Sequence, residues 1–254
     1  MKHGDFTGLA EKYSRYRPGY SESVLTAVLA LVGKPAGQID AADVGAGTGI
    51  WTAMLASRGC RTVTAVEPNE DMRRAGTEFT GEKAVRWRAG GGEQTGLESS
   101  SIDLLTMASS FHWVDFDRGT KEFARVLRPG GRFVALWNPR LIEANPLLAE
   151  TEGYIRVLRP DIKRVSSGRS GITEKLTEML SAHPDFEDVV YLEGRHMRTQ
   201  TLDEYIGAWR SVNDVQYQLG PEKFEQFLEH VRSRLQGAKI EVTYLTRAWA
   251  ARRR

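Results

Sequence analysis

The stretch Ile39-Asp-Ala-Ala-Asp-Val-Gly-Ala-Gly-Thr-Gly49 decides the fold of this chain. It is typical of a short buried strand that runs into a glycine-rich turn, and a helix is predicted from about Thr48 to Ser57. A second strand, Arg61-Thr-Val-Thr-Ala-Val66, follows and ends at Glu67. Glycines let a backbone approach a ligand closely, and an acidic side chain after the next strand can accept hydrogen bonds from both ribose hydroxyls. The stretch therefore predicts a nucleoside-binding crevice.

The turn departs from the two common phosphate-binding patterns. Gly45 and Gly47 match the first half of Gly-x-Gly-x-x-Gly, but Ile50 stands where the third glycine is needed. The sequence has no Gly-x-x-x-x-Gly-Lys-Ser/Thr run, and residues 43–57 contain no lysine or arginine that could neutralise a pyrophosphate. We therefore expect a ligand that has a nucleoside but no phosphate, of which S-adenosylmethionine is the common example.

Four motifs in register extend this pattern over roughly residues 10–140. They are Asp43-Val-Gly-Ala-Gly-Thr-Gly49, Glu67-Pro68, Ser101-Ile-Asp-Leu-Leu-Thr-Met-Ala108 and Leu127-Arg-Pro-Gly-Gly-Arg-Phe-Val-Ala-Leu-Trp137. Together they resemble the class I S-adenosylmethionine-dependent methyltransferases; the alternative is another Rossmann-like binder. The resemblance implies a methyltransferase that uses S-adenosylmethionine.

Strands and helices alternate through the first half of the chain, which predicts a doubly wound α/β fold with ligand-facing turns at the carboxyl edge of a parallel sheet. We predict strands near 39–44, 62–66, 85–88, 102–107 and 131–137, and helices near 21–32, 48–58, 69–79 and 116–127. Ser21 is a plausible cap for the first helix. Residues 1–137 are expected to form the Rossmann-like cofactor-binding core with an N-terminal cover segment.

Residues 138–254 are expected to complete the same domain as a helical substrate cover around two more strands. We predict helical structure over 138–186 and 202–236, the latter interrupted at Gly220-Pro221, and strands over 189–197 and 240–250. The family resemblance, and not periodicity, implies a seven-stranded sheet whose last strand is antiparallel.

Composition narrows the class of partner. The formal net charge of +2, from 35 basic and 33 acidic residues, gives no electrostatic case for nucleic-acid binding. Cys60 is the only cysteine, so neither an internal disulfide nor a multi-cysteine zinc site is possible, and we expect no metal. The polar N-terminus and the short apolar runs predict no signal peptide and no membrane span, so a cytoplasmic location is expected. The oligomeric state is not indicated.

The resemblance assigns the cofactor contacts to the turns at the carboxyl edge. Glu67 is expected to bind the ribose. Asp43 either orients the turn or methionine portion, or caps the turn's own N–H groups; Met72 either covers the adenine or packs in the helix core. Gly90-Gly-Gly-Glu93 departs from the family's Gly-x-Ala-Glu because Gly91 offers no side chain. The expected cofactor-binding residues here are Asp43, Gly45, Ala46, Gly47, Thr48, Gly49, Glu67, Pro68, Met72, Gly91, Gly92, Glu93 and Ser109.

Two further motifs resemble one branch of the family, which includes trans-aconitate methyltransferase. Tyr13-Ser-Arg-Tyr-Arg-Pro-Gly19 resembles its entry segment, so Tyr13 and Arg17 are expected to close over the cofactor; the alternative is a surface loop. Ser109-Ser-Phe-His-Trp113 resembles the segment after its fourth strand, where His112 is either a general base or a wall of the pocket.

Sequence motifs indicate less about the substrate pocket than about the cofactor site. Trp113 and Trp137 stand at strand ends and are expected to line the pocket. Arg169 and Trp209 come from the cover, where arginines among aromatic residues would suit an acidic substrate. We expect methyl transfer to oxygen or nitrogen of a small molecule, a carboxylate-containing metabolite being one acceptor. The alternatives are a C-methyltransferase of natural-product biosynthesis, an RNA or protein methyltransferase, and a non-catalytic binder.

Overall fold

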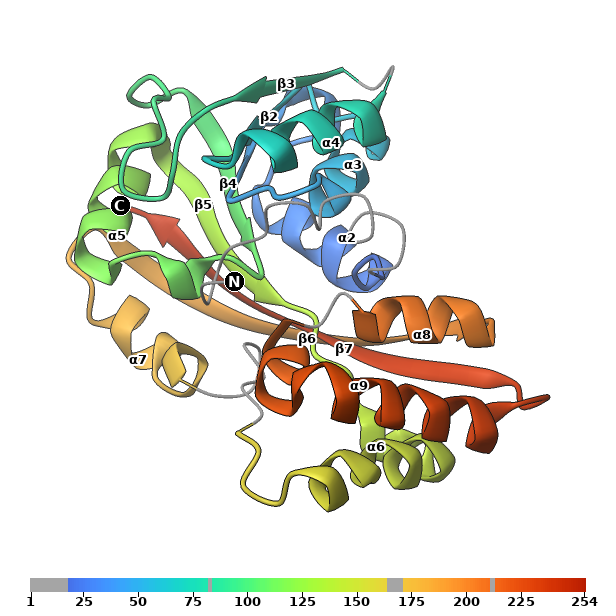
Figure 1. Ribbon diagram of the computed structural model, residues 1–254. Coiled ribbons are helices and arrows are strands. Elements are labelled where there is room, and N and C mark those ends of the chain that lie inside the picture. The colour runs from blue at the N-terminus through green and yellow to red at the C-terminus, as the bar shows by residue number, and fades with distance from the viewer. Residues whose placement is uncertain (1–17, 82–83, 164–170, 211–212) are drawn as a thin grey trace.

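The sheet has seven strands in the order β3-β2-β1-β4-β5-β7-β6 (Figure 1). The computed structural model describes residues 18–81, 84–163, 171–210 and 213–254. The first five strands pair in parallel, and β7 runs antiparallel to both of its neighbours, as predicted. The strands are β1 Asp40–Val44, β2 Thr62–Val66, β3 Val85–Arg88, β4 Ile102–Ala108, β5 Leu127–Trp137, β6 Phe186–Gln200 and β7 Ile240–Arg253.

Helices cover both faces of this sheet, which makes it doubly wound. The α-helices are α2 Glu22–Leu31, α3 Ile50–Ser57, α4 Glu70–Thr80, α5 Phe116–Val126, α6 Pro146–Leu158, α7 Leu176–Ser181, α8 Leu202–Arg210 and α9 Asn213–Leu235. The 3₁₀ turns are η1 Ala36–Gln38, η2 Phe111–Trp113, η3 Ile142–Ala144 and η4 Gly171–Glu174.

Consecutive strand residues point into two different cores, as a sheet buried on both faces requires. Leu104 packs with α2 and α3 residues such as Leu25 and Leu55. Its neighbour Leu105 packs on the opposite face with Phe123 of α5 and Leu180 of α7. The near-continuous apolar run of β4 follows from this burial.

A third core lies beyond the carboxyl end of β5. The register pairs β5 with residues 247–252 of β7, so β6 is the only strand that pairs with residues 240–246 of β7, which also form an isolated bridge between Tyr244 and Arg140. Ile240 and Val242 from this extension pack against α6, α8 and α9. In Figure 1, α6 and α9 lie together beside this long two-stranded ribbon. The helical structure predicted for the second half of the chain thus packs on strands of the main sheet.

Element boundaries differ from the predictions at the start of α3 and in β5, β6 and β7. Helix α3 begins at Ile50 and not Thr48, because Gly49 adopts a left-handed φ of 80° at its N-cap. Ser21 holds the N-cap position of α2 but makes no side-chain capping bond; its hydroxyl pairs with Ser23 at 2.8 Å. β5, β6 and β7 are longer than predicted, and β5 begins at Leu127 and not near residue 131. The predicted break at Gly220-Pro221 is present as a non-helical φ of 73° at Gly220.

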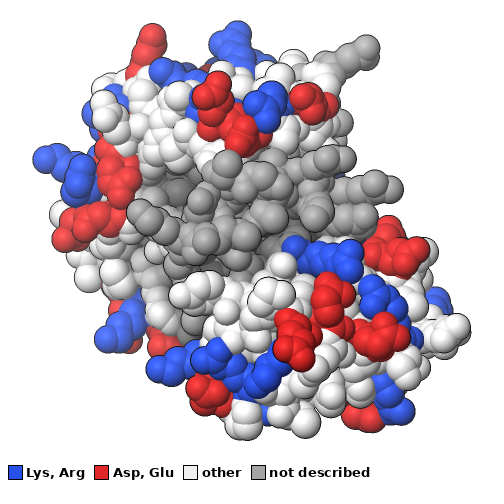
Figure 2. Space-filling view, viewed as in Figure 1, with Lys and Arg blue, Asp and Glu red and all other residues white. Residues whose placement is uncertain are grey.

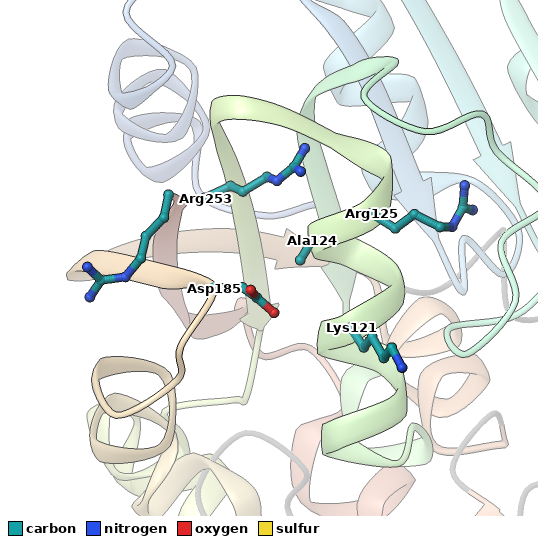
Figure 3. Close-up of a pocket in the computed structure, with 6 residues that line it drawn as sticks. Lys121, Ala124, Arg125, Asp185 and Arg253 are labelled. Atoms are coloured by element: carbon teal, nitrogen blue, oxygen red, sulfur yellow. The ribbon is translucent and has the colours of Figure 1, made fainter.

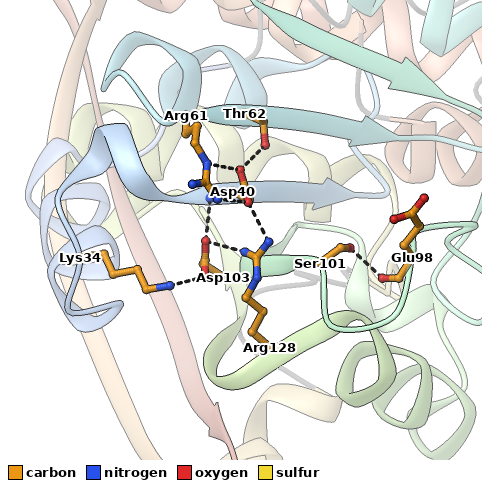
Figure 4. A network of polar contacts seen from close by, with 8 residues as sticks. All are labelled: Lys34, Asp40, Arg61, Thr62, Glu98, Ser101, Asp103 and Arg128. Atoms are coloured by element: carbon orange, nitrogen blue, oxygen red, sulfur yellow. Dashed lines mark hydrogen bonds and ion pairs between the residues drawn. The ribbon is translucent and has the colours of Figure 1, made fainter.

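An ion-pair network closes the amino edge of the sheet (Figure 4). Asp103 accepts from Lys34 Nζ at 2.7 Å and from the backbone N–H of Asp40 at 2.9 Å. Arg128 bridges the two carboxylates, with Nη2 2.9 Å from Asp40 and Nη1 2.8 Å from Asp103, and Arg61 donates to Asp40 as well. The starts of β1, β2 and β4 are therefore joined through paired charges.

Surface charge is mixed on the face seen in Figure 2, where basic and acidic side chains lie among one another. None of the helices in the described part of the chain combines the length and hydropathy needed to cross a bilayer.

Candidate functional site

The glycine-rich turn after β1 sits at the carboxyl edge, held by the end of β2. The N–H groups of Gly45 and Ala46 donate to the Val66 carbonyl at 2.8 and 3.2 Å. Gly45, Gly47 and Gly49 all have positive φ. A Cβ on Gly45 would lie 2.7 Å from Ser110 Cβ, whereas a Cβ on Gly47 would meet nothing within 4 Å. Gly45 is thus required by packing, and Gly47 leaves open space at the turn.

Glu67, which follows β2, faces this turn. One carboxylate oxygen accepts from the N–H of Gly47 and the other from the N–H of Asn69, both at 2.9 Å. The residue is only 7% exposed, and burial raises the pKa of its carboxyl group. Each oxygen has a second acceptor site, so the group is held in place and retains capacity for ligand hydroxyls.

Asp43, the predicted second acidic residue, is fully buried beneath the turn. It accepts from the hydroxyls of Thr52 at 2.6 Å and Thr106 at 3.1 Å, and not from the turn's N–H groups. Burial raises the pKa of Asp43 to about 7. The side chain therefore ties α3 and β4 to the end of β1.

The turn also contains an unsatisfied buried group. Thr48 is 1% exposed, and its hydroxyl has no hydrogen-bond partner within the described residues. Buried hydroxyls are rarely left unpaired. An orphaned hydroxyl, an open turn at Gly47 and a positioned carboxylate at Glu67 together fit a nucleoside ligand such as S-adenosylmethionine.

Three further predicted contacts, Pro68, Met72 and Glu93, come after β2 and β3 in the chain. Met72 is 4% exposed, and its N–H donates to the side chain of Asn69, the N-cap of α4. The Pro68 carbonyl accepts from Arg73. Glu93 accepts from the N–H of Asp115 at 3.0 Å and so anchors the start of α5.

The loop after β3 borders an open cavity of about 510 Å³. Gly91 pairs with Gln94 in an isolated bridge, and a Cβ on Gly92 would lie 2.4 Å from Val114. The cavity is lined by Ala89, Gly90, Gly91, Glu93, Gln94, Gly96 and Arg118.

The segment after β4 carries backbone strain. Ser109 has φ 57°, a value uncommon for a residue other than glycine. Its N–H donates to Leu136 at 2.7 Å, and its hydroxyl lies 3.0 Å from Tyr20 Oη. Ser110 donates to the Val44 carbonyl at 3.0 Å. The strained turn thus joins β1, β4 and β5 at the edge where the site is expected.

Two of the predicted pocket residues, Trp113 and Trp137, lie beside His112 and differ in their exposure. Trp113 is 51% exposed, and its ring lies 4.7 Å from the imidazole. Trp137 is fully buried in the core and contacts Trp249 at 5.7 Å between ring centroids. Its indole nitrogen lies 3.3 Å from Nδ1 of the half-buried His112.

Trp209 lies in the core between α6, α8, α9 and β7 at 1% exposure. The guanidinium of Arg140 stacks 4.6 Å from the centroid of its ring and forms a bidentate ion pair with Glu152. Tyr205 also donates to Glu152. This network fastens the end of β5 to α6 and α8.

The predicted residues Tyr13, Arg17 and Arg169 lie outside the described residues.

A clamp on residues 19–21 was not predicted. The Gly19 carbonyl accepts from Asn138 Nδ2 and from His196 Nε2, both at 2.9 Å. The Ser21 N–H donates to Thr246 Oγ1 at 2.8 Å. These partners are more than a hundred residues away in sequence, so local sequence patterns do not predict the contacts.

A second cavity, of about 270 Å³, lies at the opposite end of the sheet (Figure 3). It is lined by Lys121, Ala124, Arg125, Asp185, Arg253 and Arg254. Its guanidinium groups are engaged: Arg125 binds Glu122, Arg253 binds Ser100, and Arg254 binds Glu187. This cavity is separate from the candidate site.

Among the described residues no three histidine, cysteine or acidic side chains gather as metal ligands would.

Comparison with known proteins now identifies the family. The model of a methyltransferase domain matches residues 42–135, which span β1 to β5. An uncharacterized methyltransferase-like protein of Schizosaccharomyces pombe is 33% identical over 186 residues, covering 72% of this chain and 68% of that protein. The chain belongs to the methyltransferase-domain family.

Other members extend the comparison. An uncharacterized methyltransferase of Mycobacterium tuberculosis is 38% identical over 128 residues, 50% of this chain and 49% of the relative. The chain thus spans about half the length of the first curated relatives it matches. A solved structure from Anaeromyxobacter dehalogenans, described as a candidate type II methyltransferase, has a TM-score of 0.71 at 23% identity, covering 93% of this chain and 98% of that one. It supports the Rossmann-like fold.

Proposed function

We propose that this chain binds S-adenosylmethionine at the carboxyl edge of β1, β2 and β4 and transfers its methyl group to oxygen or nitrogen of a small molecule. A carboxylate-containing metabolite is one acceptor in this class. One observation carries the proposal. In a chain of the methyltransferase-domain family, the buried Glu67 carboxylate is held by two backbone N–H groups beside a glycine turn.

The residues present suit the nucleoside part of that ligand. Glu67 would accept hydrogen bonds from the ribose hydroxyls, and Gly47 would allow close approach because a Cβ there has open space around it. The unsatisfied Thr48 hydroxyl would gain a partner. Tyr13 and Arg17 remain predicted contacts.

When bound, S-adenosylmethionine supplies an activated methyl group on a good leaving group. The protein then needs to hold an acceptor near the methyl and to exclude water. The helices α6, α8 and α9 pack on β7 beyond the carboxyl edge, and we propose that they form that cover. Arg169 and Trp209 remain proposed parts of it.

A small molecule is favoured over nucleic acid by charge. The chain carries a formal net charge of only +2, and basic and acidic side chains are mixed on the face in Figure 2. Proteins that bind nucleic acid commonly gather basic side chains in a patch or stripe.

Calorimetric titration tests the cofactor. We expect S-adenosylmethionine and S-adenosylhomocysteine to bind one site, and NAD⁺ not to bind, because residues 43–57 contain no cation for a pyrophosphate. Binding of NAD⁺, with no binding of S-adenosylmethionine, would reject the proposal.

Isotope transfer tests the reaction. The chain is incubated with methyl-labelled S-adenosylmethionine and either a small-metabolite extract or purified RNA. We expect label in the metabolite fraction. Label in RNA alone would exclude the small-molecule assignment and leave the methyltransferase assignment in place.

A further inference from the structure

Strand β6 forms one edge of the sheet and is longer than most strands. Among the described strands it pairs with β7 alone, in a continuous antiparallel ladder from Val190 to Gln200. An edge strand presents a row of backbone N–H and C=O groups to any strand that comes beside it, and natural edges are commonly protected by shortness, proline or bulges. β6 contains no proline, and its register shift lies before Val190. Residues 190–198 therefore offer an edge to which another strand can be added.

One face of this edge carries exposed side chains in regular alternation. They belong to Tyr191, Glu193, Arg195 and Met197, which share a face because alternate residues of a strand do so. Tyr191 is 41% exposed and Met197 is 60% exposed. The Tyr191 ring packs against Trp249 at 4.9 Å between centroids, and its hydroxyl donates to Glu193 at 2.8 Å. The face thus has two charges of opposite sign at its centre and a large apolar side chain on each side of them.

This pattern is complementary to itself about Gly194. If two copies of β6 pair antiparallel about a two-fold axis at Gly194, Glu193 of each copy lies opposite Arg195 of the other. Directly opposite side chains share a face and interact, and opposite charges there are favourable. The same register sets Tyr191 opposite Met197 on both sides of the charged pairs. An axis at Glu193 or at Arg195 would instead set like charges opposite each other.

We propose that residues 190–198 of β6 are the interface of a homodimer, in which β6 pairs antiparallel with β6 of a second copy about a two-fold axis at Gly194. The two seven-stranded sheets then join into one continuous sheet. A two-fold interface uses the same surface on both chains, and the self-complementary charges favour a second copy over an unrelated partner. This inference is independent of the proposed methyltransferase function.

The other face of β6 is compatible with the same register. The register sets Val190 opposite Arg198 and Leu192 opposite His196, so no like charges meet there. Helix α2 begins over Gly194 on this face, and the atoms nearest to a Cβ placed on that glycine belong to two serines and a valine. Small side chains beside the axis limit the bulk that the two copies bring together.

Mass measurement over a range of concentrations tests the dimer. Sedimentation equilibrium should give the wild type a mass that rises from 28.4 kDa towards twice this value. Hydrogen exchange should slow at amides within residues 190–198 as the dimer forms, because their outward N–H groups gain partners. A wild type that stays monomeric up to about 1 mM, or a dimer without added protection in β6, would overturn the inference.

Charge reversal tests the register. Glu193→Arg and Arg195→Glu each set like charges opposite each other in both pairs, so each should raise the dissociation constant of the dimer by about 10- to 100-fold. The double variant restores opposite charges in exchanged order, and its dissociation constant should return to within about threefold of the wild-type value. Arg86→Glu is the matched control, because Arg86 is exposed on β3 at the other edge of the sheet and should not affect association.

The double variant separates a paired register from a general effect of charge. Urea denaturation first establishes that the variants fold, which we expect because both side chains are exposed. If the double variant associates no better than the single variants, or if Arg86→Glu weakens the dimer equally, the register about Gly194 is wrong. These measurements need no S-adenosylmethionine, so their failure leaves the proposed function unaffected.

Discussion

The two ends of the same parallel strands treat buried carboxylates in opposite ways. At the amino edge, hydrogen bonds from Arg61, Thr62 and Arg128 hold the pKa of Asp40 well below its usual range. Burial alone would raise the pKa of Asp103, but the Asp40 N–H and the cations around it lower it overall. At the carboxyl edge, burial raises the pKa of both Asp43 and Glu67.

The difference lies in the partners. Asp40 and Asp103 contact Lys34, Arg61 and Arg128, whereas the Asp43 and Glu67 carboxylates accept hydrogen bonds from hydroxyls and backbone N–H groups. Charges paired in this way stabilise the fold. Buried carboxylates without such pairing are costly and are typical of functional sites. The amino edge thus contributes to stability, and the carboxyl edge is the proposed binding site.

Asp103→Ala should have the largest effect on stability, because it leaves the Asp40 N–H without its partner and removes one of the two carboxylates that Arg128 contacts. We expect a loss of about 3–5 kcal/mol in the free energy of unfolding, measured by urea denaturation. Lys34→Ala is the control: Lys34 is 45% exposed, so its loss should stay below about 1 kcal/mol. Equal losses in the two variants would contradict the assignment of stability to the buried carboxylate.

Asp43→Asn should change how stability depends on pH. The folded-state pKa of Asp43, about 7, lies above the unfolded value, so its contribution is fully present below pH 4 and is lost as pH rises through 7. The free energy of unfolding falls by an amount on the order of 4 kcal/mol over this window. We expect the wild type to lose stability over this window in denaturation series and the Asn variant to lose much less.

The amino edge should respond to pH with the opposite sign. The pKa values of Asp40 and Asp103 are lowered in the folded state, so their contribution is present above the unfolded pKa of about 4 and is lost on further acidification. If the free energy of unfolding depends on pH in the same way in Asp43→Asn and in the wild type between pH 4 and 7, the proposed difference between the two edges is wrong.

Gly45→Ala and Gly47→Ala separate packing from ligand approach at the turn. Both have positive φ, which costs about 1–2 kcal/mol for alanine. Only the Gly45→Ala substitution adds a clash, because its Cβ would lie 2.7 Å from Ser110. We therefore expect Gly45→Ala to lower the free energy of unfolding by roughly 2–4 kcal/mol. Gly47→Ala should fold and still lose S-adenosylmethionine affinity in a calorimetric titration. Unchanged affinity would show that the ligand does not approach Gly47.

Local patterns were enough to predict the parallel half of the fold. Apolar runs such as Leu104-Leu105 and the glycines at Gly45 and Gly47 encode a strand buried on two faces and a turn with positive φ. Both depend on neighbours in sequence. The antiparallel β7 came from family resemblance, because periodicity does not specify strand direction.

The environment of the site residues could not be predicted in the same way. Trp137 was expected to line a pocket, and its indole lies in the core against Trp249. The clamp on Gly19 depends on Asn138 and His196, which only the assembled sheet brings together. Side-chain partners of this kind arise from long-range packing and leave no spacing signal in the chain.

The most direct test compares one carboxylate from each edge by its effect on S-adenosylmethionine affinity. Glu67→Gln keeps the size of the side chain and removes the charge, so calorimetry should show binding weakened by about 1–3 kcal/mol with the fold intact. Asp103→Asn should lower stability and leave affinity unchanged. Unchanged affinity in Glu67→Gln, or an equal loss in both variants, would contradict the account.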